Sequence, residues 1–104
     1  VDHFIPYNFV SHDLLWNLIP ADPGFNSTKK DKLPQLEAYF KPFFTMQKQS
    51  IEFMNKHHPN NKLLEDYLTL FPDLDTSITE ENYRKRLEPL ISIAANNGFE
   101  YLNV

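Results

Sequence analysis

An acid and an imidazole stand side by side at Asp2 and His3, and an amide follows at Asn26. A carboxylate and an amide oxygen make a sparse oxygen site, which suits Mg²⁺ because this ion keeps several waters and accepts a substrate phosphate as a further ligand. A histidine beside such an ion is a suitable general base for water, since it exchanges protons near neutral pH. These residues predict a metal-assisted attack on a phosphodiester.

Each of these residues also has an ordinary explanation. An Asp-His pair occurs by chance in many proteins, and asparagine is common in turns because its side chain hydrogen-bonds nearby backbone. Lysine and aspartate at positions 29–32 are usual on a helix surface. The combination of all of them within residues 1–34 favours a site over coincidence.

Two short apolar runs must position the pair. Residues 3–10 are rich in aromatic and β-branched types and predict a strand that breaks at Pro6. Residues 14–20 predict a second strand, and the segment between them reads as a loop. Because successive side chains of a strand alternate between faces, Asp2 is expected to point toward a following helix and His3 toward the mouth of the loop.

A turn and a helix complete this first part of the chain. Asp22, Pro23 and Gly24 form a strong turn signal, after which Asn26 or Ser27 is expected to cap a short helix. The order strand, loop, strand, turn, helix predicts a small ββα core. His12, in the loop, is expected to be an ordinary surface histidine.

The rest of the chain has helical periodicity. Apolar residues recur every three or four positions over 34–57, and Pro42 is expected to kink or split this helix. Further helices are predicted over about 61–71 and 80–97, the last one ending at Asn97 and Gly98. The predicted fold is therefore α+β and mostly α: a ββα core at 1–34 and a helical extension at 35–104 packed on it.

Composition excludes several classes of protein. The chain has 104 residues, 41% of them hydrophobic and 14% aromatic, which fits one packed domain. It has no cysteine, so it has neither disulfides nor a thiolate zinc site, and a cytoplasmic location is compatible with this. No apolar run approaches the roughly 20 residues that span a bilayer. The net charge of −4 requires any nucleic-acid binding to use a local basic patch.

The stretch "DHFIP", followed by Asn17 and by "NSTKKDKLP", carries a resemblance. It resembles the HNH nuclease family, the ββα-metal endonucleases, and its spacing is similar to that of the HNH domain in RNA-guided CRISPR effector nucleases. The resemblance covers residues 1–34. It implies a metal-dependent endonuclease that hydrolyses DNA phosphodiester bonds and leaves a 5′-phosphate.

The resemblance also implies a role for each matching residue. His3 is the general base, and Asp2 and Asn26 bind one divalent cation, Mg²⁺ or Mn²⁺. Asn17 belongs to the catalytic set as a structural member, whose amide ties the loop between the strands and holds the backbone of His3. Three lysines are expected to contact the DNA backbone, which positions a substrate without reading its sequence: Lys29, Lys30 and Lys32.

Some features depart from the family, and alternatives remain. Many relatives carry paired cysteines that hold zinc, and this chain has none. Because the sequence opens directly on strand-like residues at Val1, we expect that further parts of a longer chain precede it.

A helical interaction or nucleic-acid-binding fragment that keeps the motif only as scaffold is the alternative function. RNA in place of DNA, the target sequence and the oligomeric state are left open by the sequence.

Overall fold

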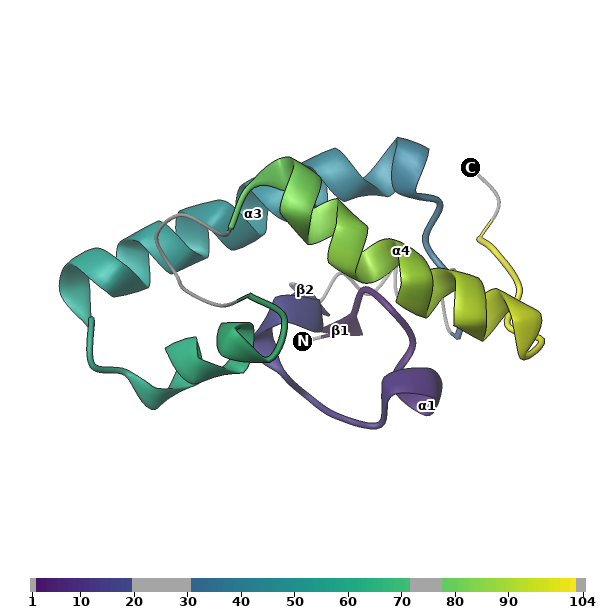
Figure 1. The fold of residues 1–104 in the computed structure, drawn as a ribbon, viewed down its shortest axis with the longest axis horizontal. Helices are drawn as coiled ribbons and strands as arrows, with labels where there is room; N and C mark the ends of the chain where they lie inside the picture. Colours follow the sequence, from purple (N-terminus) through teal and green to yellow (C-terminus); the bar gives the residue numbers. More distant parts are fainter. Residues whose placement is uncertain (1, 20–30, 72–77, 103–104) are drawn as a thin grey trace.

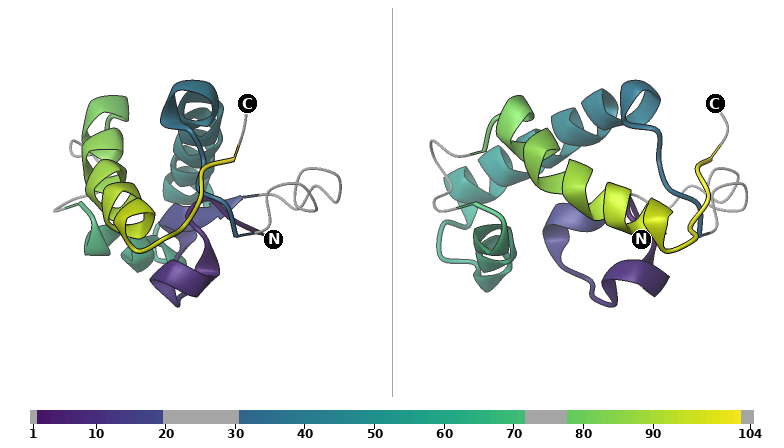
Figure 2. Two further views of the ribbon diagram at one scale, coloured as in Figure 1. Left: turned by 90° about the vertical axis from the view of Figure 1, so that its right-hand side faces the viewer. Right: turned by 45° about the vertical axis from the view of Figure 1, so that its right-hand side comes forward.

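A computed structural model describes residues 2–19, 31–71 and 78–102. Two long helices, α3 (Leu36–His57) and α4 (Glu80–Asn96), pack against each other, and the N-terminal segment lies beneath them (Figures 1 and 2). Among the described residues, no helix combines the length and apolar character that crossing a bilayer requires. The predicted class, α+β and mostly α with a two-stranded hairpin, is confirmed.

The hairpin is short. Strand β1 (Asp2–His3) pairs antiparallel with β2 (Leu18–Ile19), so that His3 lies opposite Leu18. The prediction of a strand over 3–10 was wrong beyond His3, because the chain turns and forms helix α1 (Tyr7–Val10). Pro6 precedes this helix with a φ of −52°, and proline favours a helix start while lacking the N–H that a strand ladder needs.

The second predicted strand is also shorter than expected. Residues 15–17 form a 3₁₀ turn, η1 (Leu15–Asn17), and only then does β2 begin. Both Trp16 and Asn17 are buried. Two neighbouring residues of a strand point to opposite faces, so the tighter turn is what allows both side chains to enter the core.

Helix α3 follows the predicted periodicity, with Phe40, Phe43, Gln47 and Ile51 buried. Pro42 does not split it. This proline is exposed, and so is Ala38, whose carbonyl loses its helical partner. Water can satisfy that carbonyl, which explains why the helix continues through the proline.

The remaining helical segments lie near their predicted positions. The segment predicted at 61–71 is a 3₁₀ helix, η2 (Lys62–Thr69), which Asn61 caps by accepting a hydrogen bond from the Leu63 N–H at 2.9 Å. Thr79 caps α4 through the N–H of Asn82. The helix ends as predicted, with Gly98 at a φ of +98°, a conformation that favours glycine.

Aromatic rings join the N-terminal segment to the helices. Phe4 stacks on Phe43 with ring centroids 4.0 Å apart. On α4, the ring of Tyr83 lies at the centre of an aromatic cluster. Its centroid is 5.2–6.1 Å from those of four phenylalanine rings: Phe40, Phe43, Phe44 and Phe71. The hairpin and the helices therefore share one hydrophobic core.

Two phenylalanines of α3 provide a matched test of this core. Phe43 is 5% exposed and Phe53 is 59% exposed. Phe43→Ala should lower the free energy of unfolding by about 3–4 kcal/mol, because it removes the ring on which Phe4 packs. Phe53→Ala should change it by less than about 0.5 kcal/mol. Urea denaturation measures both, and equal losses would contradict the shared core.

Candidate active site

Asp2 and His3 lie closer together than strand alternation predicted. The backbone N–H of His3 donates to Asp2 Oδ1 at 2.8 Å, and the Nδ1 atom of its ring lies 3.9 Å from the same oxygen. The expectation that the two side chains point to opposite faces is thus wrong, because the carboxylate folds back onto the next residue. The side chains of His3 and Asp2 are 16% and 26% exposed, so part of each is open to solvent.

The other nitrogen of the His3 ring contacts a residue that the sequence did not single out. His3 Nε2 and Asp13 Oδ1 are 2.7 Å apart. Asp13 lies in the loop between α1 and η1 and is 73% exposed. A signal for this contact was present, since His3 was expected to face the mouth of that loop. On the remaining side, the ring of Tyr7 lies 5.3 Å from the imidazole.

Asn17 fixes the backbone that follows His3. Its side-chain Oδ1 accepts from the Ile5 N–H at 2.7 Å, and its Nδ2 donates to the Ile5 carbonyl at 2.8 Å. Its own carbonyl accepts from the Phe4 N–H at 2.8 Å. Asn17 is fully buried, so these bonds are shielded from water.

Gln47 of α3 holds the turn that carries Asn17. The amide of Gln47 donates to the carbonyls of Leu15 and Leu18, at 3.0 and 2.8 Å, and its oxygen accepts from the Tyr67 hydroxyl. Gln47 lies within the helix predicted over 34–57, but the sequence did not single it out. A single amide within an apolar stripe was the signal that could have marked it, because a buried amide needs partners.

Two further side chains connect this turn to the helices. The Tyr83 hydroxyl donates to the carbonyl of Trp16, and Asp66 Oδ2 accepts from the Leu15 N–H at 3.0 Å. Burial raises the pKa of both Tyr67 and Tyr83, and the charge of Asp66 raises that of Tyr67 further. Both hydroxyls therefore remain neutral hydrogen-bond donors at physiological pH.

One predicted metal ligand can be examined. Asp2 Oδ1 accepts the His3 N–H, while Oδ2 has no hydrogen bond within the described residues. A partly exposed carboxylate oxygen of this kind fits a hard cation that keeps most of its waters. The second predicted ligand, Asn26, lies outside the described residues. Within the described ranges, no three His, Cys, Asp or Glu side chains form a group that could hold a metal.

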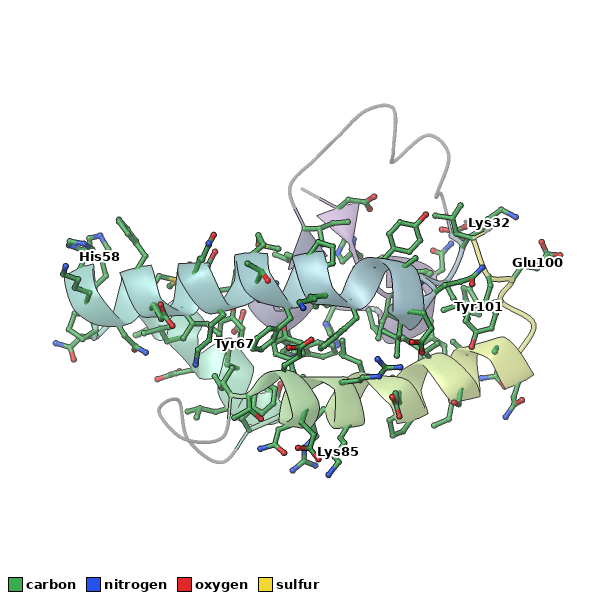
Figure 3. The ribbon with its side chains drawn as sticks, turned by 90° about the horizontal axis from the view of Figure 1, so that it is seen from above. Lys32, His58, Tyr67, Lys85, Glu100 and Tyr101 are labelled. Atoms are coloured by element: carbon green, nitrogen blue, oxygen red, sulfur yellow. The ribbon has the colours of Figure 1, made fainter. Side chains whose placement is uncertain are left out.

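The predicted DNA-contacting lysines are only partly described. Lys29 and Lys30 lie outside the described residues. Lys32 forms an ion pair with Glu100 at 3.3 Å, near one end of the molecule, while His58 lies at the opposite end of α3 (Figure 3). His12, expected to be a surface residue, is half-buried against Trp16, with ring centroids 5.1 Å apart.

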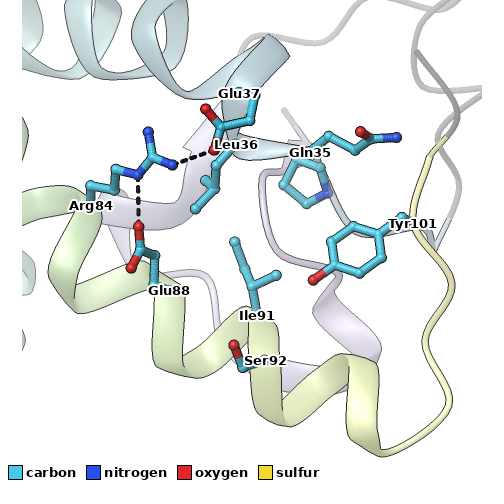
Figure 4. A pocket seen from close by; sticks show the side chains of 9 residues that line it. Gln35, Leu36, Glu37, Arg84, Glu88, Ile91, Ser92 and Tyr101 are labelled. Carbon is cyan, nitrogen blue, oxygen red and sulfur yellow. Dashed lines mark hydrogen bonds and ion pairs between the residues drawn. The ribbon is translucent and has the colours of Figure 1, made fainter.

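A pocket of about 520 Å³ lies away from this site, between the start of α3 and α4 (Figure 4). Arg84 borders it and pairs with Glu88 at 2.7 Å and with Glu37. These hydrogen bonds raise the pKa of the Arg84 guanidinium, and the bond to Glu88 has the largest effect. The pocket lining does not include Asp2 or His3, and its one arginine is already matched by two acids.

Removing the Asn17 amide should destabilise the chain. Asn17→Ala leaves the N–H and carbonyl of Ile5 buried without partners, so the free energy of unfolding should fall by about 2–4 kcal/mol. Asn8→Ala is the control, since Asn8 makes its one described bond, to Asp31, on the surface. Urea denaturation compares the two, and a small effect at Asn17 would show that water replaces its amide.

The comparisons with known proteins concern the same segment. Residues 1–35 match the sequence model of the HNH endonuclease family. No curated protein and no solved structure matches the chain. The family match indicates a nuclease-type function with a nucleic acid as substrate, and the matched segment contains Asp2, His3, Asn17 and Asn26. The resemblance to HNH endonucleases is therefore confirmed for residues 1–35, about a third of this chain.

Proposed function

We propose that this protein is a metal-dependent HNH endonuclease that hydrolyses phosphodiester bonds of DNA. The observation that carries the proposal is the juxtaposition of Asp2 and His3, with Nδ1 of the imidazole 3.9 Å from a carboxylate oxygen, inside the segment that matches the family. An acceptor for a proton and an oxygen ligand for a cation thus lie side by side, as hydrolysis of a phosphodiester requires.

In this reaction His3 takes a proton from a water molecule as the water oxygen bonds to phosphorus. The bond from phosphorus to the 3′ oxygen breaks, that oxygen takes a proton from solvent, and the other product keeps the 5′-phosphate. Asn17 acts through the backbone: its bonds to Ile5 hold the segment in which His3 is placed. Residues 1–34 carry this chemistry, and residues 35–104 support them.

Asp2 and Asn26 are the proposed ligands of the cation. Oδ2 of Asp2 supports this role, because it has no hydrogen bond among the residues that the structure describes, while Oδ1 accepts the His3 N–H. When bound there, Mg²⁺ or Mn²⁺ would supply Lewis-acid stabilisation of the negative charge that develops on the phosphate. Oxygen ligands favour these hard ions over zinc.

DNA binding is proposed to use the lysines that follow the site. Lys29, Lys30 and Lys32 provide a local positive charge in a chain whose net charge is −4. The pairing of Lys32 with Glu100 is between exposed groups, so a phosphate can compete for it at little cost. Such contacts position a substrate but do not select its sequence.

Cleavage of supercoiled plasmid tests the proposed base. The wild-type chain should nick DNA in Mg²⁺ or Mn²⁺ and not in EDTA, and His3→Ala should lower the rate by about 10²–10⁴-fold, the usual contribution of a general base. His58→Ala is a matched control, because His58 is exposed at the end of α3. A short RNA of the same sequence, run in parallel, separates the two substrate classes.

Two outcomes of this assay would count against the proposal. Nicking that persists in His3→Ala at the wild-type rate would assign the chemistry to another residue or to a contaminant. The absence of any cleavage by a folded wild-type chain would favour the alternative, a non-catalytic fragment that keeps the motif as scaffold.

Divalent-ion binding can be measured without activity. If Asp2 ligates the ion, saturating Mg²⁺ or Mn²⁺ should stabilise the wild-type chain by about 1–3 kcal/mol and raise its melting temperature. Asp2→Ala should abolish the rise. Glu52→Ala should keep it, since Glu52 is exposed on α3. An equal rise in all three proteins would mean that the ion binds elsewhere.

A further inference from the structure

The contact between His3 and Asp13 determines which ring nitrogen carries the proton. Nε2 lies 2.7 Å from Asp13 Oδ1, a hydrogen-bond distance, whereas Nδ1 lies 3.9 Å from Asp2 Oδ1, which is too long for one. An ionised carboxylate can only accept hydrogen bonds. Nε2 must therefore be the donor, and in the neutral ring the free lone pair is on Nδ1.

That lone pair is on the side where the proposed chemistry takes place. Of the two ring nitrogens, Nδ1 is the one next to Asp2, the proposed cation ligand, and Nε2 is directed to the loop. A water molecule bound near Asp2 would thus meet a nitrogen able to accept its proton. With the opposite tautomer, the same position would present an N–H group, which cannot act as a base.

The loop that presents Asp13 is tied down on both sides. Ser11 has a left-handed φ of 59° and donates its N–H to the Tyr7 carbonyl at 2.7 Å. On the other side, the Leu14 N–H donates to His12 Nδ1 at 3.3 Å. Asp13 itself makes no other hydrogen bond or ion pair within the described residues. Among the described residues, its carboxylate therefore contacts His3 alone.

This pair contributes little to folding. The Asp13 side chain is 73% exposed, and a polar contact whose carboxylate stays in water adds little to stability, although the His3 side chain is 16% exposed. Such a contact can still select between the two tautomers of a histidine, since the choice depends only on which nitrogen has an acceptor. The effect of Asp13 should therefore appear in the state of the His3 ring, and not in the melting temperature.

We propose that Asp13 is a positioning residue, which holds the His3 imidazole with its proton on Nε2 and its lone pair on Nδ1 toward Asp2. The proposal rests on the role of His3 as general base. It assigns a function to the loop between α1 and η1, which carries a carboxylate to a ring contributed by β1.

The tautomer of His3 can be read directly by nuclear magnetic resonance of the ¹⁵N-labelled chain, at a pH where the ring is neutral. Long-range ¹H–¹⁵N correlations distinguish a protonated Nε2 from a protonated Nδ1. The wild-type chain should show His3 with the proton on Nε2, and Asp13→Ala should give a mixture of both forms. A wild-type ring with its proton on Nδ1, or an unchanged ring in Asp13→Ala, would overturn the proposal.

Cleavage kinetics give the second readout. Asp13→Ala should lower kcat by about tenfold with KM unchanged, while its melting temperature stays within about 4 °C of wild type. Asp13→Glu keeps a carboxylate on the exposed loop and should recover most of the rate. Glu65→Ala removes an exposed charge on η2 and controls for the altered net charge. An unchanged or faster Asp13→Ala enzyme would contradict a positioning role.

The two readouts separate this proposal from the proposed function. If the wild-type chain cleaves nothing, the endonuclease assignment fails, and the tautomer experiment alone decides whether Asp13 orients His3. If the wild-type chain cleaves and Asp13→Ala retains both the rate and the tautomer, the endonuclease assignment stands and the role of Asp13 is refuted.

Discussion

The paired hydrogen bonds between the Asn17 amide and the backbone of Ile5 are the interaction on which the N-terminal segment depends. The hairpin itself has two residues in each strand, too few to be stable alone in water. The buried Asn17 side chain pairs with both the N–H and the carbonyl of Ile5, as one more residue of a neighbouring strand would. The position of His3 is therefore set by a side chain as much as by the sheet.

This interaction is held in place from the helices. Gln47, Tyr83 and Asp66 each bond a backbone group of the turn from residue 15 to residue 18. Buried polar networks of this kind impose one arrangement, because an unsatisfied member is costly. The helical part is thus structurally continuous with the segment that matches the HNH family, although the match ends at residue 35.

Periodicity and turn chemistry were enough to predict α3 and α4, since the apolar stripe of α3 and the caps of α4 are local features of the sequence. The residue pair Asp2 and His3 was identifiable for the same reason. The partners of His3 and Gln47 were not predicted, although His3 was expected to face the loop that carries Asp13, because these contacts join residues that only the folded chain brings together. Helix α1 was not predicted, because the aromatic residues after Pro6 favour a strand by their local propensity.

The last described residues, 100–102, lie against residues 33–35, where the family match ends. Leu33 pairs with Tyr101 in a parallel bridge, its N–H and carbonyl bonding Glu100 and Leu102 at 2.8 Å. Gln35 adds a bond to the Leu102 carbonyl at 2.8 Å. These partners come from residues 100–102, far along the chain from the residues that match the family. A truncation that spares every motif residue would therefore still remove part of the structure that surrounds the motif.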